Sequence, residues 1–329
     1  MCMNELYSVS VNSKFNMLKK LTRYFSHTVM VPHYLKHYGL RKTVKTFFYY
    51  NYRLFKLRNL DTTKEQIVNV NGYKLLVVPG DPGISSELQI FNVHEPITTK
   101  ITIQELKEGM TCLDIGSNIG YYALMESKAV GNNGKVISIE PSPKNFEQIK
   151  KNLELEKISN VDVYNFAAGD KDDEVNFLIH ERSNLCSVIP IGEPIPKSTN
   201  IIKVPLKRLD TFLEEMKLDK LDFVRMDIEG YEMNLFEGSW NAIKKFKPMI
   251  QMEFHDNLFD IEEKIKFFER LKKEGYEIKY FIPRALDRPM VGEMNDVKDY
   301  KIDDLIEMFR NGSLFHGIIM FLENQLNKK

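Results

Sequence analysis

Hydrophobic and polar residues alternate in short runs along most of this chain. Residues 66–77, QIVNVNGYKLLV, alternate on both sides of Asn71-Gly72, the residue pair that tight two-residue hairpin turns prefer. From residue 111 onward, short runs rich in β-branched residues alternate with stretches of helical periodicity. This alternation is typical of parallel strands that are joined by crossover helices. The pattern therefore predicts a hairpin followed by a large α/β domain.

Within the α/β domain we expect one main sheet and a smaller insertion. Ser142 followed by Pro143 indicates a capped helix start. Asp210 is predicted to cap a short helix, and one helix after the fourth strand is expected to run through Phe246. Two alternating runs, 173–180 and 201–210, look like an inserted pair of strands. The strands predicted for the main sheet are 111–116, 135–141, 161–169, 221–230, 248–255, 276–282 and 315–323.

The first 60 residues differ from the rest of the chain in charge. They hold eleven Lys and Arg residues against the single acid Glu5, although the whole chain has 46 residues of each sign. The segment is also aromatic, as in KTFFYYNYRLFKLRN (residues 45–59). Two interpretations stay open: a helical cap with its aromatic residues on the main domain, and a surface for a membrane or polyanion. The expected domains are a basic, aromatic helical extension (1–65), the hairpin with a connecting segment (66–110) and the main domain (111–329).

Composition argues against several classes of protein. The chain has 329 residues, of which 43% are hydrophobic and 28% charged, as in ordinary globular proteins. Its three cysteines lack paired spacing, which argues against a disulfide scaffold or a zinc site. No apolar stretch reaches the roughly 18 residues that span a bilayer, and the first residues lack the apolar core of a signal peptide. We expect a cytoplasmic protein, with membrane association through residues 1–60 as the open alternative.

The end of the first predicted strand carries the clearest chemical signal. In residues 112–124, CLDIGSNIGYYAL, a D-x-G-x-N-x-G spacing runs from Asp114 to Gly120 before a helix. Glycine permits tight turns and close ligand contact, and a helix N-terminus offers free N–H groups and a positive partial charge. This turn suits a ligand carboxylate, Asp114 suits an ammonium group, and Glu140, at the end of the second strand, suits ribose hydroxyls. Together these groups describe S-adenosylmethionine.

Two other nucleotide-binding motifs fit the chain less well. The dinucleotide fingerprint G-x-G-x-x-G fails, because the second and third glycine positions counted from Gly116 are Asn118 and Tyr121. The phosphate-binding P-loop fails, because the chain contains no Gly-Lys-Ser/Thr sequence. A purely structural turn stays open for the isolated motif, but Glu140 at the expected strand end makes it less favoured.

Five sequence blocks occur in an order that resembles one enzyme family. They are LDIGSNIGYYAL, ISIEPSP, NFAAGD, VRMDIEGYEMNLFEG and PMIQMEFH. The set, within roughly residues 90–322, resembles the FkbM-type methyltransferases, which use S-adenosylmethionine and have the class I methyltransferase fold. The resemblance implies a Rossmann-like, doubly wound, seven-stranded and mostly parallel sheet whose last strand is antiparallel. It also implies methylation of an oxygen, often on a sugar or a natural-product hydroxyl.

Matched position by position, the resemblance implies a set of cofactor-binding residues. Glu140 would bind the ribose, and the end of the third strand would line the adenine. At that strand end, alanine stands where many class I enzymes have an acidic residue, which leaves the contact to the adenine amino group unassigned. The implied cofactor-binding residues are Asp114, Gly116, Ser117, Asn118, Gly120, Glu140, Phe166, Ala167 and Ala168.

Methyl transfer to oxygen requires an aligned acceptor and a group that takes its proton. The candidates stand at the ends of the fourth and fifth predicted strands: Asp227, Glu253 and His255. In one interpretation, Asp227 or His255 is a general base and no metal takes part. In the other, all three residues bind a divalent metal that lowers the pKa of the acceptor hydroxyl. We favour the first, because a mixed carboxylate and imidazole set fits several metals and none decisively.

The sequence therefore predicts an enzyme that methylates a hydroxyl on a sugar, glycan or other small-molecule acceptor. The alternative is a methyltransferase-like module that binds the cofactor without turnover. Nucleic acid is not an expected substrate, because the predicted catalytic domain is net acidic and phosphate contacts require a basic face.

Overall fold

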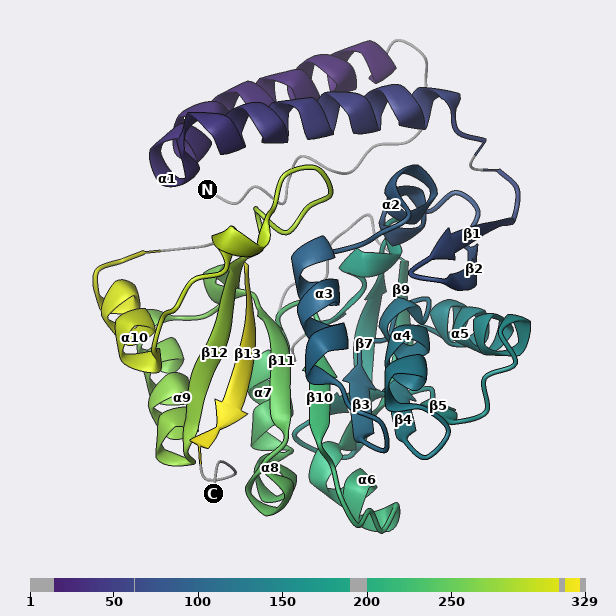
Figure 1. The fold of residues 1–329 in the computed structure, drawn as a ribbon, viewed down its shortest axis with the longest axis vertical. Helices are drawn as coiled ribbons and strands as arrows, with labels where there is room; N and C mark the ends of the chain where they lie inside the picture. The colour runs from purple at the N-terminus through teal and green to yellow at the C-terminus, as the bar shows by residue number, and fades with distance from the viewer. Residues whose placement is uncertain (1–14, 62, 190–199, 314–316, 326–329) are drawn as a thin grey trace.

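A seven-stranded sheet forms the centre of the molecule (Figure 1). The computed structural model describes residues 15–61, 63–189, 200–313 and 317–325. The strand order is β12-β13-β11-β10-β3-β4-β5, and neighbours are parallel except that β13 runs antiparallel to β11 and β12. The strands are β3 (Thr111–Ile115), β4 (Lys135–Ile139), β5 (Val161–Tyr164), β10 (Phe223–Met226), β11 (Met249–Phe254), β12 (Tyr276–Pro283) and β13 (Ile318–Asn324). The predicted sheet with an antiparallel last strand is confirmed.

Helices cover both faces of the main sheet. Every residue of β3 is buried, as expected for a strand between two helical layers. Leu113 and Ile115 face one core and Cys112 faces the other, because alternate side chains of a strand point to opposite sides. The helices on the Cys112 side are α3 (Pro96–Glu105), α4 (Tyr121–Val130) and α5 (Pro143–Leu155). Those on the other side are α6 (Leu209–Glu215), α7 (Glu232–Glu237), α8 (Trp240–Phe246), α9 (Ile261–Lys273) and α10 (Ile302–Arg310).

The predicted hairpin and the predicted Ser142 cap are both present. β1 (Gln66–Val70) pairs antiparallel with β2 (Tyr73–Val77). The turn residues Asn71 and Gly72 have φ values of 51° and 84°, and two positive φ angles are the type I′ geometry that the sequence predicts. At the start of α5, Oγ of Ser142 accepts a hydrogen bond from the backbone N–H of Asn145 at 3.4 Å.

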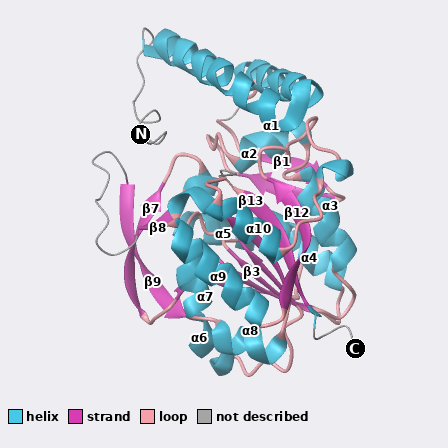
Figure 2. Ribbon diagram, turned by 90° about the vertical axis from the view of Figure 1, so that its left-hand side faces the viewer, coloured by secondary structure: helices cyan, strands magenta, loops and turns pink. Residues whose placement is uncertain are grey.

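A second, smaller sheet lies to one side of the main sheet (Figure 2). Its order is β6 (Ala167–Gly169), β9 (Asn200–Arg208), β7 (Asp173–Ile179) and β8 (Ser187–Ile189). β7 and β9 are the inserted pair expected from the sequence. The prediction of one strand over 161–169 is wrong, because the chain leaves the main sheet after Tyr164 and joins the second sheet at Ala167. Asn165 stabilises this change of direction, since its amide donates to the backbone oxygens of Glu140 (2.8 Å) and Pro141 (3.0 Å).

Two helix predictions also require correction. The single helix expected after the fourth strand is divided into α7 and α8 around Gly238. A Cβ on Gly238 would lie 1.8 Å from the backbone oxygen of Gly169, so two backbones meet here at a distance that only glycine allows. Asp210 does not cap its own helix. Its carboxylate instead accepts hydrogen bonds from the backbone N–H groups of Asn241 (3.2 Å) and Ala242 (2.8 Å) at the start of α8.

The N-terminal segment forms α1 (Phe15–Asn59), which bends at Gly39 (φ 75°, ψ 171°) and lies across the carboxyl end of the main sheet (Figure 1). Its second half packs on α2 (Ile84–Phe91), where the ring of Tyr49 stacks on Phe91 with centroids 5.3 Å apart. Leu286 and Val291, in the loop after β12, complete this cluster. The inner face of α1 thus packs as the helical-cap interpretation expects. Within the described part of the chain, none of the helices combines the length and apolar character needed to cross a bilayer.

Candidate active site

A cavity opens at the carboxyl ends of β3, β4 and β10, next to the second sheet. The strand ends and the second sheet surround about 560 Å³ of space, open solvent included. Open α/β sheets bind their ligands at this edge. Six of the predicted site residues line the cavity: Gly116, Asn118, Glu140, Ala167, Ala168 and Asp227.

The glycine turn after β3 has a backbone that few other sequences adopt. Gly116, Asn118 and Gly120 have φ values of 80°, 52° and 87°, a region that favours glycine and tolerates asparagine. A Cβ on Gly116 would lie 2.0 Å from the backbone oxygen of Asp227. Oδ1 of Asn118 is buried and has no hydrogen-bond partner among the described residues. Both features fit a turn that holds a polar ligand against its backbone.

Glu140 lies at the end of β4 and is buried, with 4% of its surface exposed. Its carboxylate accepts hydrogen bonds from the backbone N–H groups of Asn118 (2.8 Å) and Ser142 (2.9 Å). Burial raises the pKa of Glu140 to about 7, and these two hydrogen bonds oppose part of the rise. The carboxyl group therefore changes charge near neutral pH, and in its ionised form it can accept hydrogen bonds from ligand hydroxyls.

Asp114 has a different role from the one predicted for it. It is fully buried, does not line the cavity, and accepts a hydrogen bond from Nη1 of Arg225 at 2.9 Å. Arg225 also pairs through Nη2 with Oδ2 of Asp227 at 3.1 Å, and its guanidinium lies 4.0 Å from the ring centroid of Tyr122. Asp114 thus fixes an arginine that in turn orients Asp227. The ammonium contact predicted for Asp114 gains no support from this placement.

Three other predicted cofactor residues lie outside the lining of the cavity. Oγ of Ser117 donates to the backbone oxygen of Asp114 at 2.9 Å and supports the turn from behind. Gly120 precedes the first residue of α4. Phe166 packs in the core against Phe212, with ring centroids 4.9 Å apart. These residues shape the site without reaching the cavity.

His255 follows β11 and is surrounded by carboxylates. Its Nδ1 lies 2.7 Å from Oε1 of Glu232 and its Nε2 lies 3.3 Å from Oε2 of Glu229. Burial lowers the pKa of His255, but Glu232 and Glu229 outweigh burial and hold the pKa well above its usual value. An imidazole that keeps its proton at neutral pH is a poor general base. The environment therefore favours Asp227 over His255 for that role.

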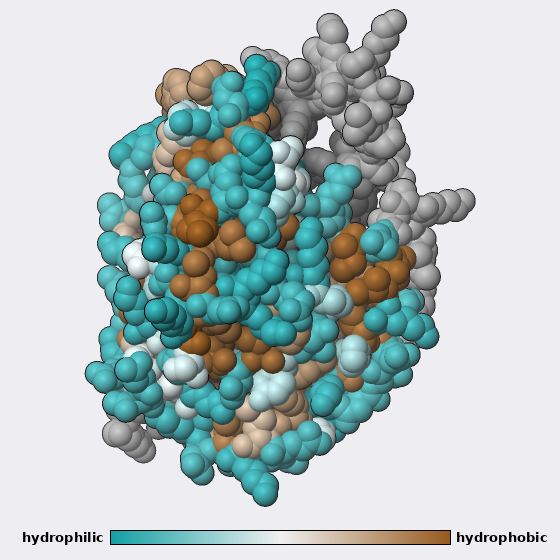
Figure 3. Space-filling model, turned by 90° about the vertical axis from the view of Figure 1, so that its right-hand side faces the viewer, coloured by the Kyte–Doolittle hydropathy of each residue, from teal (hydrophilic) through white to brown (hydrophobic). Residues whose placement is uncertain are grey.

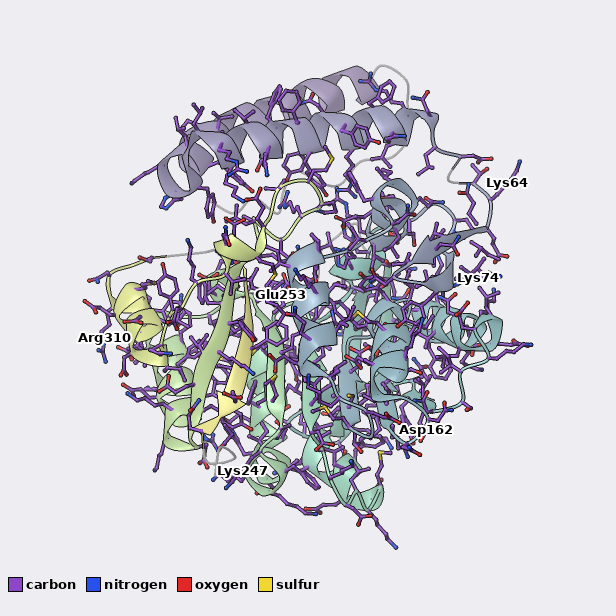
Figure 4. The ribbon with its side chains drawn as sticks, in the orientation of Figure 1. Lys64, Lys74, Asp162, Lys247, Glu253 and Arg310 are labelled. Atoms are coloured by element: carbon purple, nitrogen blue, oxygen red, sulfur yellow. The ribbon has the colours of Figure 1, made fainter. Side chains whose placement is uncertain are left out.

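Glu253, the second-to-last residue of β11, belongs to a buried ionic cluster at the same edge of the sheet (Figure 4). Arg284 donates through Nε to Oε1 of Glu253 at 2.9 Å and pairs through Nη2 with Oε1 of Glu95 at 2.9 Å. Burial raises the pKa of Glu253 to about 8, although Arg284 lowers it in part. Glu95 has a φ of 45°, and non-glycine residues in this region often mark functional sites.

The sequence analysis did not identify Glu95 or its neighbour His94. Nε2 of His94 lies 3.1 Å from Oε1 of Glu95, and its Nδ1 lies 2.8 Å from Oε2 of Glu87. Burial lowers the pKa of His94, but Glu95 and Glu87 raise it to about 10. The signal available in the sequence was an adjacent histidine and acid directly before Pro96, where α3 begins.

Among the residues that the structure describes, two sets of three side chains have ligand atoms within 4.8 Å of one another, close enough to hold one cation. They are Asp227, Glu229 and His255, and Glu95, Asp227 and Glu253. The set predicted from the sequence, Asp227, Glu253 and His255, differs from both. In each set a protein cation already lies beside the carboxylates: His255 beside Glu229, and Arg284 beside Glu95 and Glu253. This pairing favours the interpretation without a metal, which stays a prediction.

The second sheet supplies a wall of the cavity that the sequence analysis missed. Phe177 of β7 and Val188 of β8 line the cavity together with Ser183 and Cys186. Asp81, in the segment after β2, holds this wall in place, since it accepts hydrogen bonds from the backbone N–H (3.1 Å) and the hydroxyl (2.8 Å) of Ser183. Residues 102 positions apart therefore close the cavity together.

The chain is similar to several known proteins. The chain matches the sequence profile of the family described as Methyltransferase FkbM domain over residues 114–328. Methyltransferase 1 of Beauveria bassiana is 25% identical over 177 residues, which cover 49% of this chain and 71% of that protein. Hexuronic acid methyltransferase AglP of Haloferax volcanii is 22% identical over 165 residues, or 47% of this chain and 60% of that protein. The crystal structure of methyltransferase FkbM from Methylobacillus flagellatus KT has a TM-score of 0.39 and 16% identity, covering 66% of this chain and 44% of that one.

Proposed function

The chain belongs to the FkbM methyltransferase family, and on this premise we propose that it methylates a hydroxyl oxygen of a sugar or glycan acceptor. It is an S-adenosylmethionine-dependent methyltransferase. The similarity to AglP, whose name states that it acts on a hexuronic acid, supports a sugar as acceptor. The observation that carries the proposal is the placement of Asp227 between the cofactor cavity and the ionic cluster.

The cavity offers this cofactor suitable groups from the chain itself. When bound, S-adenosylmethionine supplies an electrophilic methyl group on a sulfonium. Gly116 and Asn118 would hold its methionine part, and Glu140 would accept hydrogen bonds from its ribose. Ala167 and Ala168 would leave room for the adenine. The fit rests on the buried Oδ1 of Asn118, which has no hydrogen-bond partner among the described residues, and on Glu140, which lines the same cavity.

Asp227 is placed to accept the proton of an acceptor hydroxyl. Its side chain is 20% exposed, so it is within reach of the cavity. Arg225 fixes Oδ2 at 3.1 Å, whereas Oδ1 is buried and without a hydrogen-bond partner among the described residues. Burying a carboxylate oxygen without a hydrogen-bond partner costs free energy, which points to a function for this oxygen. Orientation of Oδ1 toward the acceptor is the contribution that we assign to Arg225.

This placement also distinguishes an enzyme from a cofactor-binding module. A module that only binds the cofactor needs the glycine turn and Glu140, but it has no need for a buried arginine that orients a second carboxylate. Arg225 lies between Asp114 and Asp227 and is itself buried, an arrangement that is expensive to maintain unless it serves the reaction. The Arg225–Asp227 ion pair therefore supports a catalytic function.

The test is the variant Asp227→Asn, assayed with glucuronic acid, its methyl glycoside and neutral hexoses as acceptors. We expect kcat to fall by about 10² to 10⁴, the usual share of a general base, while the Kd for S-adenosylmethionine changes by less than about threefold. Asp170→Asn is the matched control, because Asp170 is an acid at the end of β6 that does not line the cavity. Unchanged kcat in Asp227→Asn would contradict the assigned role, and activity abolished by EDTA would favour the metal interpretation.

A further inference from the structure

The outward face of α1 between residues 40 and 58 is apolar and basic and is exposed in the described part of the chain, and it lies at the same end of the molecule as the candidate active site. From these features we propose that this face binds the surface of an anionic lipid bilayer. We call it the α1 outer face and define it as Leu40, Val44, Phe47, Phe48, Phe55, Lys56 and Arg58.

The apolar side chains of the α1 outer face are strongly exposed. Leu40, Phe48 and Phe55 are 69%, 60% and 61% exposed, values typical of polar surface residues. They recur at helical spacing on the side away from the buried residues Thr46 and Tyr49, of which Tyr49 stacks on Phe91 of α2. Of the fourteen exposed large hydrophobic residues in the described part of the chain, eight lie between positions 31 and 55 of α1. Such a concentration marks an interaction site rather than ordinary surface.

The charge of the same segment indicates an anionic partner. Residues 31–59 contain seven Lys and Arg residues and no Asp or Glu. Some of these cations serve the domain, since Lys42 and Lys45 pair with Asp296 and Glu293. Lys36, Lys56 and Arg58 are exposed, and the described residues give them no carboxylate partner. A helix that joins aromatic residues with lysine and arginine fits the interface of an anionic membrane, where rings enter the acyl boundary and cations meet the headgroups.

Charge also argues against a second copy of the chain as the partner. Two α1 outer faces brought together would oppose cations to cations, which costs free energy at any closely packed contact. Hydrophobic side chains at the upper edge of Figure 3, where α1 lies in Figure 1, stand among hydrophilic ones. This mixture suits an interfacial surface better than a dry interface between subunits.

The location of α1 relates membrane binding to the candidate active site. The inner face of α1 packs on α2 and on the loop after β12, and Arg284 at the start of that loop contacts Glu253. Glu253 lies beneath α1 at the upper end of the sheet (Figure 4). A bilayer bound to the α1 outer face would therefore lie near the acceptor side of the active site. Resting on the function proposed above, this position indicates an acceptor that is attached to a lipid.

Sedimentation of the full chain with vesicles tests the proposal. The vesicles contain phosphatidylcholine alone or an equimolar mixture with phosphatidylglycerol. We expect binding to the anionic vesicles, and at least about tenfold weaker binding for Phe47→Ser/Phe48→Ser/Phe55→Ser and for Lys56→Glu/Arg58→Glu. The matched control is Ile67→Ser/Ile103→Ser/Ile261→Ser, which removes side chains that are 55%, 44% and 45% exposed elsewhere on the molecule. This control should bind vesicles as the unmodified chain does.

Three outcomes would overturn the proposal. The first is no sedimentation with anionic vesicles. The second is equal vesicle binding by the unmodified chain and by Phe47→Ser/Phe48→Ser/Phe55→Ser. Binding would then rest on electrostatic attraction alone, without contact by the aromatic side chains. The third is a dimer of the full chain, seen by light scattering, that the phenylalanine variant converts to a monomer. Unchanged affinity for S-adenosylmethionine shows that each variant is folded, and since no acceptor is used, failure here leaves the proposed methylation untouched.

Discussion

The two halves of the active-site edge are built in different ways. The half that we assign to the cofactor, around Gly116 and Glu140, comes from one glycine turn and the end of the next strand, and its hydrogen bonds are mostly to backbone groups. The half that we assign to the acceptor, around Asp227 and Glu253, is a network of buried and partly buried charges. Its members come from α2, the residue before α3, the end of β10 and the residue that follows it, β11 and the loop after β12.

We expect the cofactor half to recognise its ligand by shape and the acceptor half to recognise its ligand by charge. At Gly116 the turn packs against the backbone of Asp227 so closely that only glycine fits, and because this is a steric contact it hardly depends on salt. The network depends on each partner, because removing one ion from a buried pair leaves the other unpaired at high cost. Changes in the acceptor half should therefore affect stability and turnover, whereas changes in the cofactor half should affect cofactor affinity.

The largest expected effect is that of Arg225→Met in the acceptor half. Arg225 is 6% exposed and bridges Asp114 and Asp227, so its loss leaves two carboxylates unpaired and should lower the free energy of unfolding by about 3 to 5 kcal/mol. Arg310→Met is the control, because that arginine is 59% exposed in its pair with Glu269 and should cost less than about 1 kcal/mol. Urea unfolding measures both. Equal losses would show that the network is not the source of stability.

The second largest expected effect is a loss of cofactor affinity when the cofactor half is changed. Gly116→Ala adds a Cβ 2.0 Å from the backbone oxygen of Asp227 at a φ of 80°. We expect the affinity for S-adenosylmethionine to fall by at least about 100-fold, equivalent to about 2.7 kcal/mol, since the turn must shift away from its ligand. Gly109→Ala shares the positive φ (83°) but meets no atom within 4 Å, and should leave affinity unchanged. Titration calorimetry gives both affinities. Similar affinities in the two variants would show that the turn at Gly116 does not hold the cofactor.

The smallest effect is a dependence of cofactor affinity on pH. Burial raises the pKa of Glu140 to about 7, and ribose hydroxyls donate to the ionised form. As pH rises from 6 to 8 the ionised fraction grows, so affinity for S-adenosylmethionine should increase by up to about tenfold and then level off. Glu140→Gln should remove this dependence. A slope of the opposite sign, or the same slope in the variant, would exclude Glu140 as the titrating group.

Sequence reasoning succeeded where short segments determine their own structure. The type I′ turn at Asn71 and the Ser142 cap depend on neighbouring residues, and the structure confirms both conformations. It failed where tertiary contacts decide. Asp210 caps α8 rather than its own helix, and α10 forms in the long stretch before the last strand that the sequence left without a predicted helix.

The same distinction explains the incomplete prediction of the site. Asp227 and Glu140 were found because each stands at the end of a predicted strand. Glu95 was missed because its partner Arg284 lies far along the chain, and no pattern within one segment shows such a pair. The role of His255 could not be inferred from its strand position, because three carboxylates from separate positions set its charge.

The most direct measurement is calorimetric titration of S-adenosylmethionine into the unmodified chain, Glu140→Ala and Asp227→Asn, with methyl transfer to the glycan panel followed in parallel. Our account predicts that Glu140→Ala loses cofactor binding, while Asp227→Asn binds the cofactor within about threefold of the unmodified chain but turns over at least about 100-fold more slowly. Loss of cofactor binding in Asp227→Asn, or full binding in Glu140→Ala, would contradict the division of the edge into a cofactor half and an acceptor half.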